Sequence, residues 1–198
     1  IPMESSKLSG EDTKALAYSL LTPDQIATFE RDRELDMSFG LDGGRFRVNV
    51  FLQRGWVSVA IRLLPAGIRS FEECGLPMKS MEELCRRKKG LVLITGSTGS
   101  GKSTTMASMI DYRNGTKTGH ILTIEDPIEF VFKHRKSIVS QREVRVDTHS
   151  YENALINAMR EAPDMLMLGE IRDRSTLQTA LLFAQTGHLC MSTLHANN

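Results

Sequence analysis

The sequence has no long run of hydrophobic residues, although 40% of its 198 residues are hydrophobic. Its longest apolar stretches, such as residues 91–94, are far shorter than the roughly 20 residues that a membrane-spanning helix needs. No secretory signal precedes them. Because the chain begins at Ile1 and stops at Asn198 in the middle of a motif, we expect both ends to be cut, so a targeting segment can lie outside this sequence.

Cysteine is scarce, and neither sign of charge is in excess. The three cysteines are odd in number and too scattered for a disulfide framework or a metal knuckle, which is typical of a protein of the reducing cytoplasm. Lys and Arg number 25 against 24 Asp and Glu, so the basic surplus that usually accompanies nucleic-acid binding is missing. The hydrophobic share is too high, and the net charge of +1 too low, for a disordered chain.

What is present falls into two blocks, 1–66 and 81–198, joined by a predicted linker at 67–80 that is interrupted by proline and glycine. In the first block Thr22 to Gln25 forms a capping box with proline at the first helical position, which predicts the start of a helix. Apolar and polar residues then alternate over 35–41, 46–50 and 57–63. These patterns predict a small α/β domain, an antiparallel meander with helices on one face and arginines on the other.

The second block alternates apolar strands with amphipathic helices. Strands are predicted at 91–95, 121–124, 138–144, 165–168 and 189–192, and helices at about 102–112, 151–161 and 177–184. The continuous apolar run at 91–95 indicates a strand that is covered on both faces. Repeated β-α units with short connections predict an α/β fold of three layers, in which a parallel sheet lies between helices.

The turn after the first strand of the second block carries the phosphate-loop pattern G-x-x-x-x-G-K-[ST]. Its glycines let backbone N–H groups point at phosphate oxygens, and the following helix adds positive potential at its N-terminus. Lys102 is placed to meet the β- and γ-phosphates of ATP, and the Ser103 hydroxyl to bind Mg²⁺. The residues expected to bind the nucleotide are Gly96, Ser97, Thr98, Gly99, Ser100, Gly101, Lys102, Ser103 and Thr104.

Acidic residues follow two other predicted strands. Glu170 comes after the apolar run at 165–168, at the end of a strand where a P-loop enzyme holds its metal; the alternative is a solvated helix cap. The strand at 121–124 is followed by three acids, Glu125, Asp126 and Glu129. Carboxylates this close in sequence repel one another, which favours a cluster that binds a cation or has a catalytic role. An acidic surface turn explains this cluster equally well, so the residues alone leave its role open.

Two histidines, His188 and His195, flank the last predicted strand. Neither has the spaced partners of a zinc site, which excludes that interpretation. A structural role and a γ-phosphate sensor at the end of the strand are the remaining alternatives.

Four motifs together carry a resemblance to a known family. They are the glycine loop, residues 121–129, residues 168–173, and residues 186–189 with 192–195. They resemble the Walker A motif, Asp box, Walker B motif and His box of the secretion and type IV pilus motor ATPases. Residues 115–123, 139–144, 157–164 and 194–198 look most like the retraction motors of the PilT/PilU type, especially PilU. The resemblance implies a RecA-like P-loop NTPase core, without its C-terminal subdomain, preceded by a PAS-like domain that is incomplete at its start.

The resemblance also implies roles for single residues. Glu129, the last acid of the Asp box, would polarise the attacking water while Glu170 serves the metal, and His195 belongs to the catalytic set. Arg47 and Arg62 match arginines that the front domain of the family donates to the γ-phosphate. The alternative for these two arginines is a solvated basic strand face.

The implied function is a hexameric motor that hydrolyses MgATP to power pilus retraction and twitching motility. Its implied partners are further copies of the chain, an inner-membrane platform protein and a paralogous retraction ATPase, at the cytoplasmic face of the inner membrane and without nucleic acid. A pilus-assembly or type II secretion ATPase of the same family is the alternative. A DNA translocase on the same core and a non-hydrolysing structural partner of the motor are alternatives from other classes.

Overall fold

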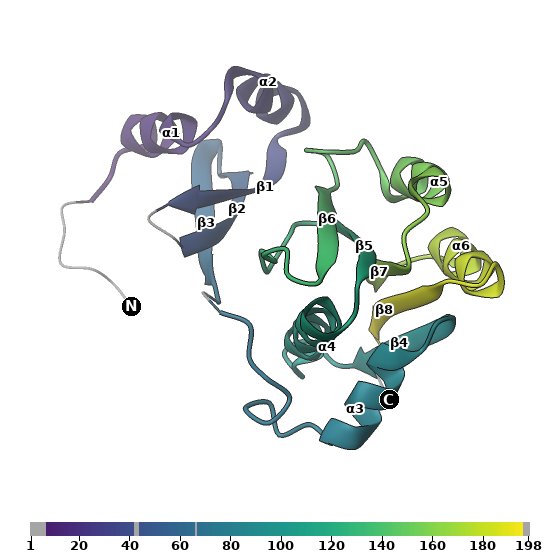
Figure 1. Ribbon diagram of the computed structural model, residues 1–198. Helices are drawn as coiled ribbons and strands as arrows, with labels where there is room; N and C mark the ends of the chain where they lie inside the picture. The colour runs from purple at the N-terminus through teal and green to yellow at the C-terminus, as the bar shows by residue number, and fades with distance from the viewer. Residues whose placement is uncertain (1–6, 42–43, 66, 196–198) are drawn as a thin grey trace. The chain divides into compact units, whose positions relative to one another are not determined.

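The computed structural model describes residues 7–41, 44–65 and 67–195. The chain divides into two compact units, Ile1–Leu64 and Pro65–Asn198 (Figure 1). Among the described residues no helix is both long and apolar enough to cross a membrane. All three cysteines are free thiols.

The first unit pairs two short helices with a three-stranded antiparallel sheet of order β1-β2-β3. Thr22 and Gln25 cap the second helix reciprocally, because the side chain of each accepts the backbone N–H of the other. The predicted helix start and the predicted meander are therefore confirmed. The elements are α1 (Gly10–Ser19), α2 (Pro23–Asp32), β1 (Glu34–Leu41), β2 (Gly44–Gln53) and β3 (Trp56–Leu64).

Alternation along these strands separates an apolar face from a basic one. Val48 of β2 lies opposite Met37 of β1, and both are buried in one cluster with Phe29 of α2. The neighbouring residue in sequence points to the other face of the sheet, where Arg47 lies directly opposite Arg62 of β3. The sheet therefore has the helix-covered face and the arginine-bearing face that its alternation predicts.

The second unit contains a five-stranded sheet of order β4-β8-β7-β5-β6, in which every neighbouring pair is parallel. Helices cover both of its faces (Figure 1). Ile110 of α4 packs with Ile121 on one face, and Leu155 of α5 and Phe183 of α6 pack with Leu122 on the other. This confirms the predicted three-layer fold. The elements are α3 (Met78–Arg86), β4 (Gly90–Gly96), α4 (Lys102–Thr116), β5 (Gly119–Glu125), β6 (Ser137–Glu143), α5 (Tyr151–Glu161), β7 (Met165–Ile171), α6 (Arg174–Gln185) and β8 (Leu189–His195).

Strand β4 packs on both faces, as the apolar run at 91–95 predicts. Val92 and Ile94 pack with the cluster that contains Ile110 of α4, and Leu91 packs with the cluster that contains Phe183 of α6. The apolar run does not reveal that β4 forms one edge of the described sheet, where it pairs with β8. Its residues are half-buried or exposed, and Leu93 keeps 38% of its surface exposed. An apolar run reports hydrophobicity but not strand order, so it does not distinguish an edge strand from a central one.

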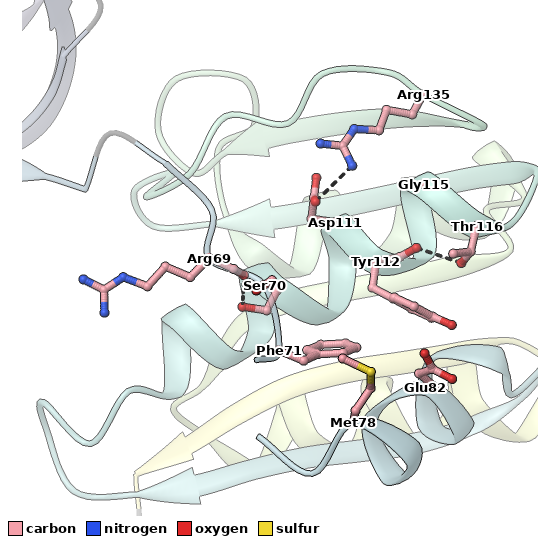
Figure 2. Close-up of a pocket in the computed structure, with 11 residues that line it drawn as sticks. Arg69, Ser70, Phe71, Met78, Glu82, Asp111, Tyr112, Gly115, Thr116 and Arg135 are labelled. Atoms are coloured by element: carbon pink, nitrogen blue, oxygen red, sulfur yellow. Dashed lines mark hydrogen bonds and ion pairs between the residues drawn. The ribbon is translucent and has the colours of Figure 1, made fainter. Parts of the chain in front are cut away.

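Residues 67–80, expected to link the two blocks, pack against the second unit. The ring of Phe71 is buried, with its centroid 5.2 Å from that of Tyr112 in α4. The Ser108 hydroxyl donates to the backbone carbonyl of Arg69 at 2.6 Å. A cavity of about 350 Å³ lies between this segment, α3 and the second half of α4 (Figure 2). Residues 67–80 thus pack against α4, the helix that begins at the phosphate loop.

Candidate functional site

The phosphate loop joins β4 to α4, and its backbone has a conformation that glycine adopts readily. The angle φ is +78° at Gly99 and +92° at Gly101, in the left-handed region. A Cβ atom on Gly96 would lie 2.7 Å from the hydroxyl oxygen of Ser100, so the loop also closes tightly there. Helix α4 begins directly after Gly101, so its free N-terminal N–H groups point into the loop. Residues 96–104 therefore form a strand–loop–helix cradle suited to phosphate.

Lys102 lies at the N-terminus of α4 with only 8% of its surface exposed. Its ammonium group donates to the carbonyl oxygens of Gly96 at 3.0 Å and Ser97 at 2.8 Å. The ammonium is therefore held inside the loop, where a phosphate oxygen would approach. Ser103, the next residue, is exposed.

The strand order brings His195 and Glu170 beside this loop. Strand β8 lies between β4 and β7, and its register pairs His195 with Gly96. Nδ1 of His195 lies 3.4 Å from Nζ of Lys102, and Nε2 lies 3.3 Å from Oε2 of Glu170. Because an ammonium group can only donate, this geometry assigns Nδ1 as its acceptor and places the ring proton on Nε2, facing Glu170. His195 thus connects the phosphate loop to the acid at the end of β7.

Two arginines bind the carboxylate of Asp126, and one of them also binds Glu170. Nη2 of Arg145 and Nη1 of Arg172 donate to Oδ2 of Asp126 at 2.9 and 3.1 Å. Nε of Arg172 donates to Oε1 of Glu170 at 2.6 Å, and Nη2 contacts the same oxygen. Burial opposes the charge of Arg172, but the two carboxylates outweigh it, and the pKa of Arg172 is raised.

Glu125 lies at the end of β5 and is buried, with 6% of its surface exposed. The Thr123 hydroxyl and the Gln141 amide donate to its Oε1 at 2.7 and 3.2 Å, and the backbone N–H of Glu129 donates to Oε2 at 3.4 Å. Burial raises the pKa of Glu125 to about 7, although these three hydrogen bonds lower it. Glu125 therefore exchanges its proton near neutral pH.

Glu129 lies on a loop that its neighbours hold firmly. Ile128 and Phe130 on either side of it are buried. The Ile128 N–H donates to Oε2 of Glu143 at 3.1 Å, and the Phe130 carbonyl accepts from the Gln141 amide at 2.8 Å. Glu129 itself is half-buried, and within the described residues its carboxylate makes no hydrogen bond or ion pair. The loop thus presents this acid on a fixed backbone.

The three acids of this cluster are accommodated in three different ways. Glu125 is buried among hydrogen-bond donors, Asp126 keeps 10% of its side chain exposed between two arginines, and Glu129 stays unpaired among the described residues. Two of the three acids are therefore buried or paired, whereas Glu129 keeps a partly exposed carboxylate.

The sequence profile described as type II/IV secretion system protein matches residues 31–198 of this chain. The chain belongs to this family. It is 45% identical to the type IV pilus ATPase PilU of Pseudomonas aeruginosa and 46% identical to the retraction ATPase PilT of the same organism. The two alignments cover 100% and 96% of this chain, and 52% and 56% of those proteins.

A crystal structure of the pilus retraction motor PilT with bound ADP has the same fold as the present chain. The TM-score is 0.90 at 58% identity, over 94% of this chain and 55% of that chain. The match confirms the fold predicted from the resemblance, an N-terminal domain followed by a RecA-like core. This chain spans about half the length of the relatives that it matches.

Sequence reasoning named Glu129 and Glu170 within the family motifs but missed the side chains that bind beside them. Arg172 binds both Asp126 and Glu170, and Arg145 binds Asp126 from the loop after β6. A signal for Arg172 was present, because it lies two residues after Glu170 and directly follows the strand that carries this acid. Arg145 lies far from the Asp box in sequence, and only the pairing of β5 with β6 brings the two together.

The oxygen donors of the site fit a magnesium ion that arrives with a nucleotide. Within residues 7–41, 44–65 and 67–195, no three His, Cys, Asp or Glu side chains gather as a metal site of their own. The Ser103 hydroxyl and the Glu170 carboxylate are hard donors of the kind that Mg²⁺ prefers, and Mg²⁺ usually completes its shell with water and substrate phosphates.

Glu125→Gln is expected to flatten the dependence of stability on pH. The folded pKa of Glu125 is about 7, above the ordinary value of about 4.3, so the folded state keeps a proton that the unfolded state releases. Stability therefore falls as pH rises from about 4.3 to about 7, by an amount of the order of 3 kcal/mol. A glutamine does not titrate, so the variant should lose most of this slope in urea unfolding measured at about pH 5 and pH 7.5.

The exposed Glu72, changed to Gln, is the matched control and should keep the slope of the unmodified protein. Equal slopes for the Glu125→Gln variant and the unmodified protein would show that Glu125 is ionised in the folded state throughout this range.

Proposed function

We propose that this chain is the ATP-binding part of a hexameric motor that hydrolyses ATP to power retraction of a type IV pilus. The observation that carries the proposal is the contact of Lys102, inside a phosphate loop, with His195, which in turn contacts Glu170. It occurs in a chain that is 45–46% identical to PilU and PilT over nearly its whole length.

The chemistry follows from the positions of the side chains. The phosphates of ATP lie against the N–H groups of residues 96–103, and Lys102 neutralises part of their charge. Ser103 and Glu170 would hold Mg²⁺, which supplies further neutralisation of the phosphate oxygens. Glu129, on its fixed loop, orients the attacking water and accepts its proton.

Arg47 and Arg62 stabilise the charge that develops on the transferred phosphoryl group. The two side chains are direct cross-strand partners on β2 and β3. Like charges placed directly opposite one another destabilise a sheet, by up to about 1 kcal/mol. A strand pair that carries this cost is well suited to an anion, and this supports a role beyond that of a solvated basic face.

Arg47→Ala or Arg62→Ala should slow ATP turnover at least tenfold while nucleotide affinity changes little. An arginine that acts on the transition state can contribute about 10³–10⁵ in kcat, whereas ground-state binding depends on the phosphate loop. The folded state should not lose stability, because each change removes one of two positive charges that lie directly opposite one another in the sheet. Phosphate release and nucleotide titration measure the two effects separately.

Arg54→Ala is the matched control, because Arg54 is exposed at the turn between β2 and β3. Turnover that stays unchanged in all three variants would return Arg47 and Arg62 to a solvated basic face.

The work of the motor would come from movement of the front domain during the ATP cycle. Such rigid-body motions around six subunits would turn an inner-membrane platform protein and draw pilin subunits out of the fibre. We place the motor at the cytoplasmic face of the inner membrane, acting with the platform protein and with a paralogous retraction ATPase.

An assembly or secretion ATPase is the second candidate. A type II secretion system protein E of Pseudomonas aeruginosa is 39% identical over 79% of this chain, and the assembly ATPase PilB of Myxococcus xanthus is 36% identical over 80%. These relatives match less of the chain, at lower identity, than PilU and PilT do. The comparison supports retraction.

Counting surface pili in cells that lack this protein tests the assignment. A retraction motor is expected to leave assembly intact, so pili should accumulate and fail to shorten under the microscope. Absent pili would indicate an assembly motor, and normal pili with loss of secreted proteins would indicate a secretion ATPase.

A further inference from the structure

A continuous path of polar contacts joins the phosphate loop to the Asp box. It runs from Lys102 through His195, Glu170 and Arg172 to Asp126, with separations of 3.4 Å or less between successive partners. Each step pairs a donor with an acceptor, so the path has one consistent arrangement of protons. It connects residues that are distant in sequence but lie near one another at the carboxyl ends of the parallel strands.

Arg172 is the residue of this path that links Glu170 to Asp126, the first residue after β5. Its guanidinium group gives Nε and Nη2 to Glu170 and Nη1 to Asp126. Asp126 and Glu170 keep only 10% and 22% of their side chains exposed, so each carboxylate needs a cation nearby. A planar guanidinium can bind two carboxylates at once with fixed geometry, whereas a lysine ammonium is a single point charge.

The backbones of the two motifs also approach one another closely. A Cβ atom on Gly169 would lie 3.4 Å from Cα of Glu125 and 3.5 Å from the carbonyl oxygen of Ile124. The end of β7 therefore packs directly on the end of β5, beside the arginine contact. The residue that follows Gly169 thus lies close to the backbone at the start of the Asp box.

Asp126 is the first residue of the loop that carries Glu129. The residue before it, Glu125, is buried, and Ile128 on the far side is anchored to Glu143. The free movement of Asp126 is therefore small, and its orientation depends on the two arginines that bind it, Arg145 and Arg172. Whatever fixes Asp126 also fixes the backbone three residues before Glu129.

We infer that Arg172 is a positioning residue that ties the placement of Glu129 to the orientation of Glu170. The inference rests on the proposed function, in which Glu170 serves the metal and Glu129 orients water. The orientation of Glu170 then affects the position of the Asp box through the contacts of Arg172. Hydrolysis is favoured when both acids are in place together.

Arg172→Gln and Arg172→Lys are the variants that test this inference. Loss of a side chain that orients a metal-binding or reacting group typically costs 10–100-fold in activity, so kcat should fall by about that factor in both. The apparent KM for ATP should change less than about threefold, because Lys102 and the loop are untouched. The lysine variant keeps the charge but cannot bridge two carboxylates, so it should resemble the glutamine variant.

Arg145→Gln is the matched comparison, because Arg145 binds Asp126 without contacting Glu170 in the described structure. It should lower kcat by a smaller factor than Arg172→Gln does. Arg174→Gln, on the exposed start of α6, should leave turnover unchanged. Equal losses in Arg172→Gln and Arg145→Gln, or full turnover in Arg172→Lys, would show that Asp126 needs only a neighbouring positive charge.

Hydrogen exchange of the segment 126–132 gives a readout that needs no hydrolysis. Glu170→Gln should speed exchange of this segment about tenfold when Arg172 is present, because a charge-assisted hydrogen bond is weakened. The same change should have no further effect in the Arg172→Gln background. An equal effect in both backgrounds would overturn the inference, whereas absent ATP hydrolysis with intact coupling would overturn only the proposed function.

Discussion

Glu129→Gln is expected to leave ATP binding intact and to slow hydrolysis by about 10²–10⁴-fold, the usual contribution of a general base. The amide has the size of the carboxylate, and Ile128 and Phe130 remain buried on either side, so the loop should keep its conformation. The neutral amide, however, cannot accept a proton from the attacking water. Titration with a fluorescent ATP analogue measures the binding, and phosphate release measures the rate.

Glu72→Gln, an exposed change of the same type, serves as the control and should leave both quantities unchanged. Glu170→Gln completes the comparison, because it should weaken binding in the presence of Mg²⁺. If instead Glu129→Gln loses the metal-dependent binding and Glu170→Gln keeps it, the two acids have exchanged roles.

Lys102→Ala is expected to abolish ATP hydrolysis, with a loss of more than about 100-fold. The ammonium neutralises phosphate charge in a loop that otherwise offers only backbone dipoles, and it also closes the loop through Gly96 and Ser97. Both effects are lost in the variant, so nucleotide binding should weaken as well. Phosphate release and equilibrium nucleotide binding are the measurements.

Lys89→Ala removes an exposed lysine immediately before β4 and should leave turnover unchanged. Appreciable turnover in Lys102→Ala would contradict the assignment of the phosphate loop. The same result would remove the role given to the contact between Lys102 and His195.

The sequence predicts the elements of this fold well because their signals are local. The capping box at Thr22 begins α2, and the alternation around Val48 and Arg47 places each on its own face of the sheet. Strand order is not a local property. The apolar run of β4 therefore predicts a strand that packs on both faces, but it does not predict the edge position of β4 beside β8.

The same distinction explains what sequence reasoning recovers of the site. The phosphate loop is contiguous, so spacing alone identifies it. The contacts around Asp126 combine side chains that follow three different strands, β5, β6 and β7. No spacing in the sequence predicts that these side chains meet. Likewise, the register that pairs His195 with Gly96 turns an ambiguous histidine into a neighbour of Lys102.

The rate of phosphate release from ATP by this protein, with Mg²⁺ and after its chelation, tests the proposed ATPase activity most directly. Release is expected to require Mg²⁺ and to disappear in Lys102→Ala. A protein that binds ATP but releases no phosphate at any Mg²⁺ concentration would contradict the proposed activity. So would release that continues at the unmodified rate without Lys102.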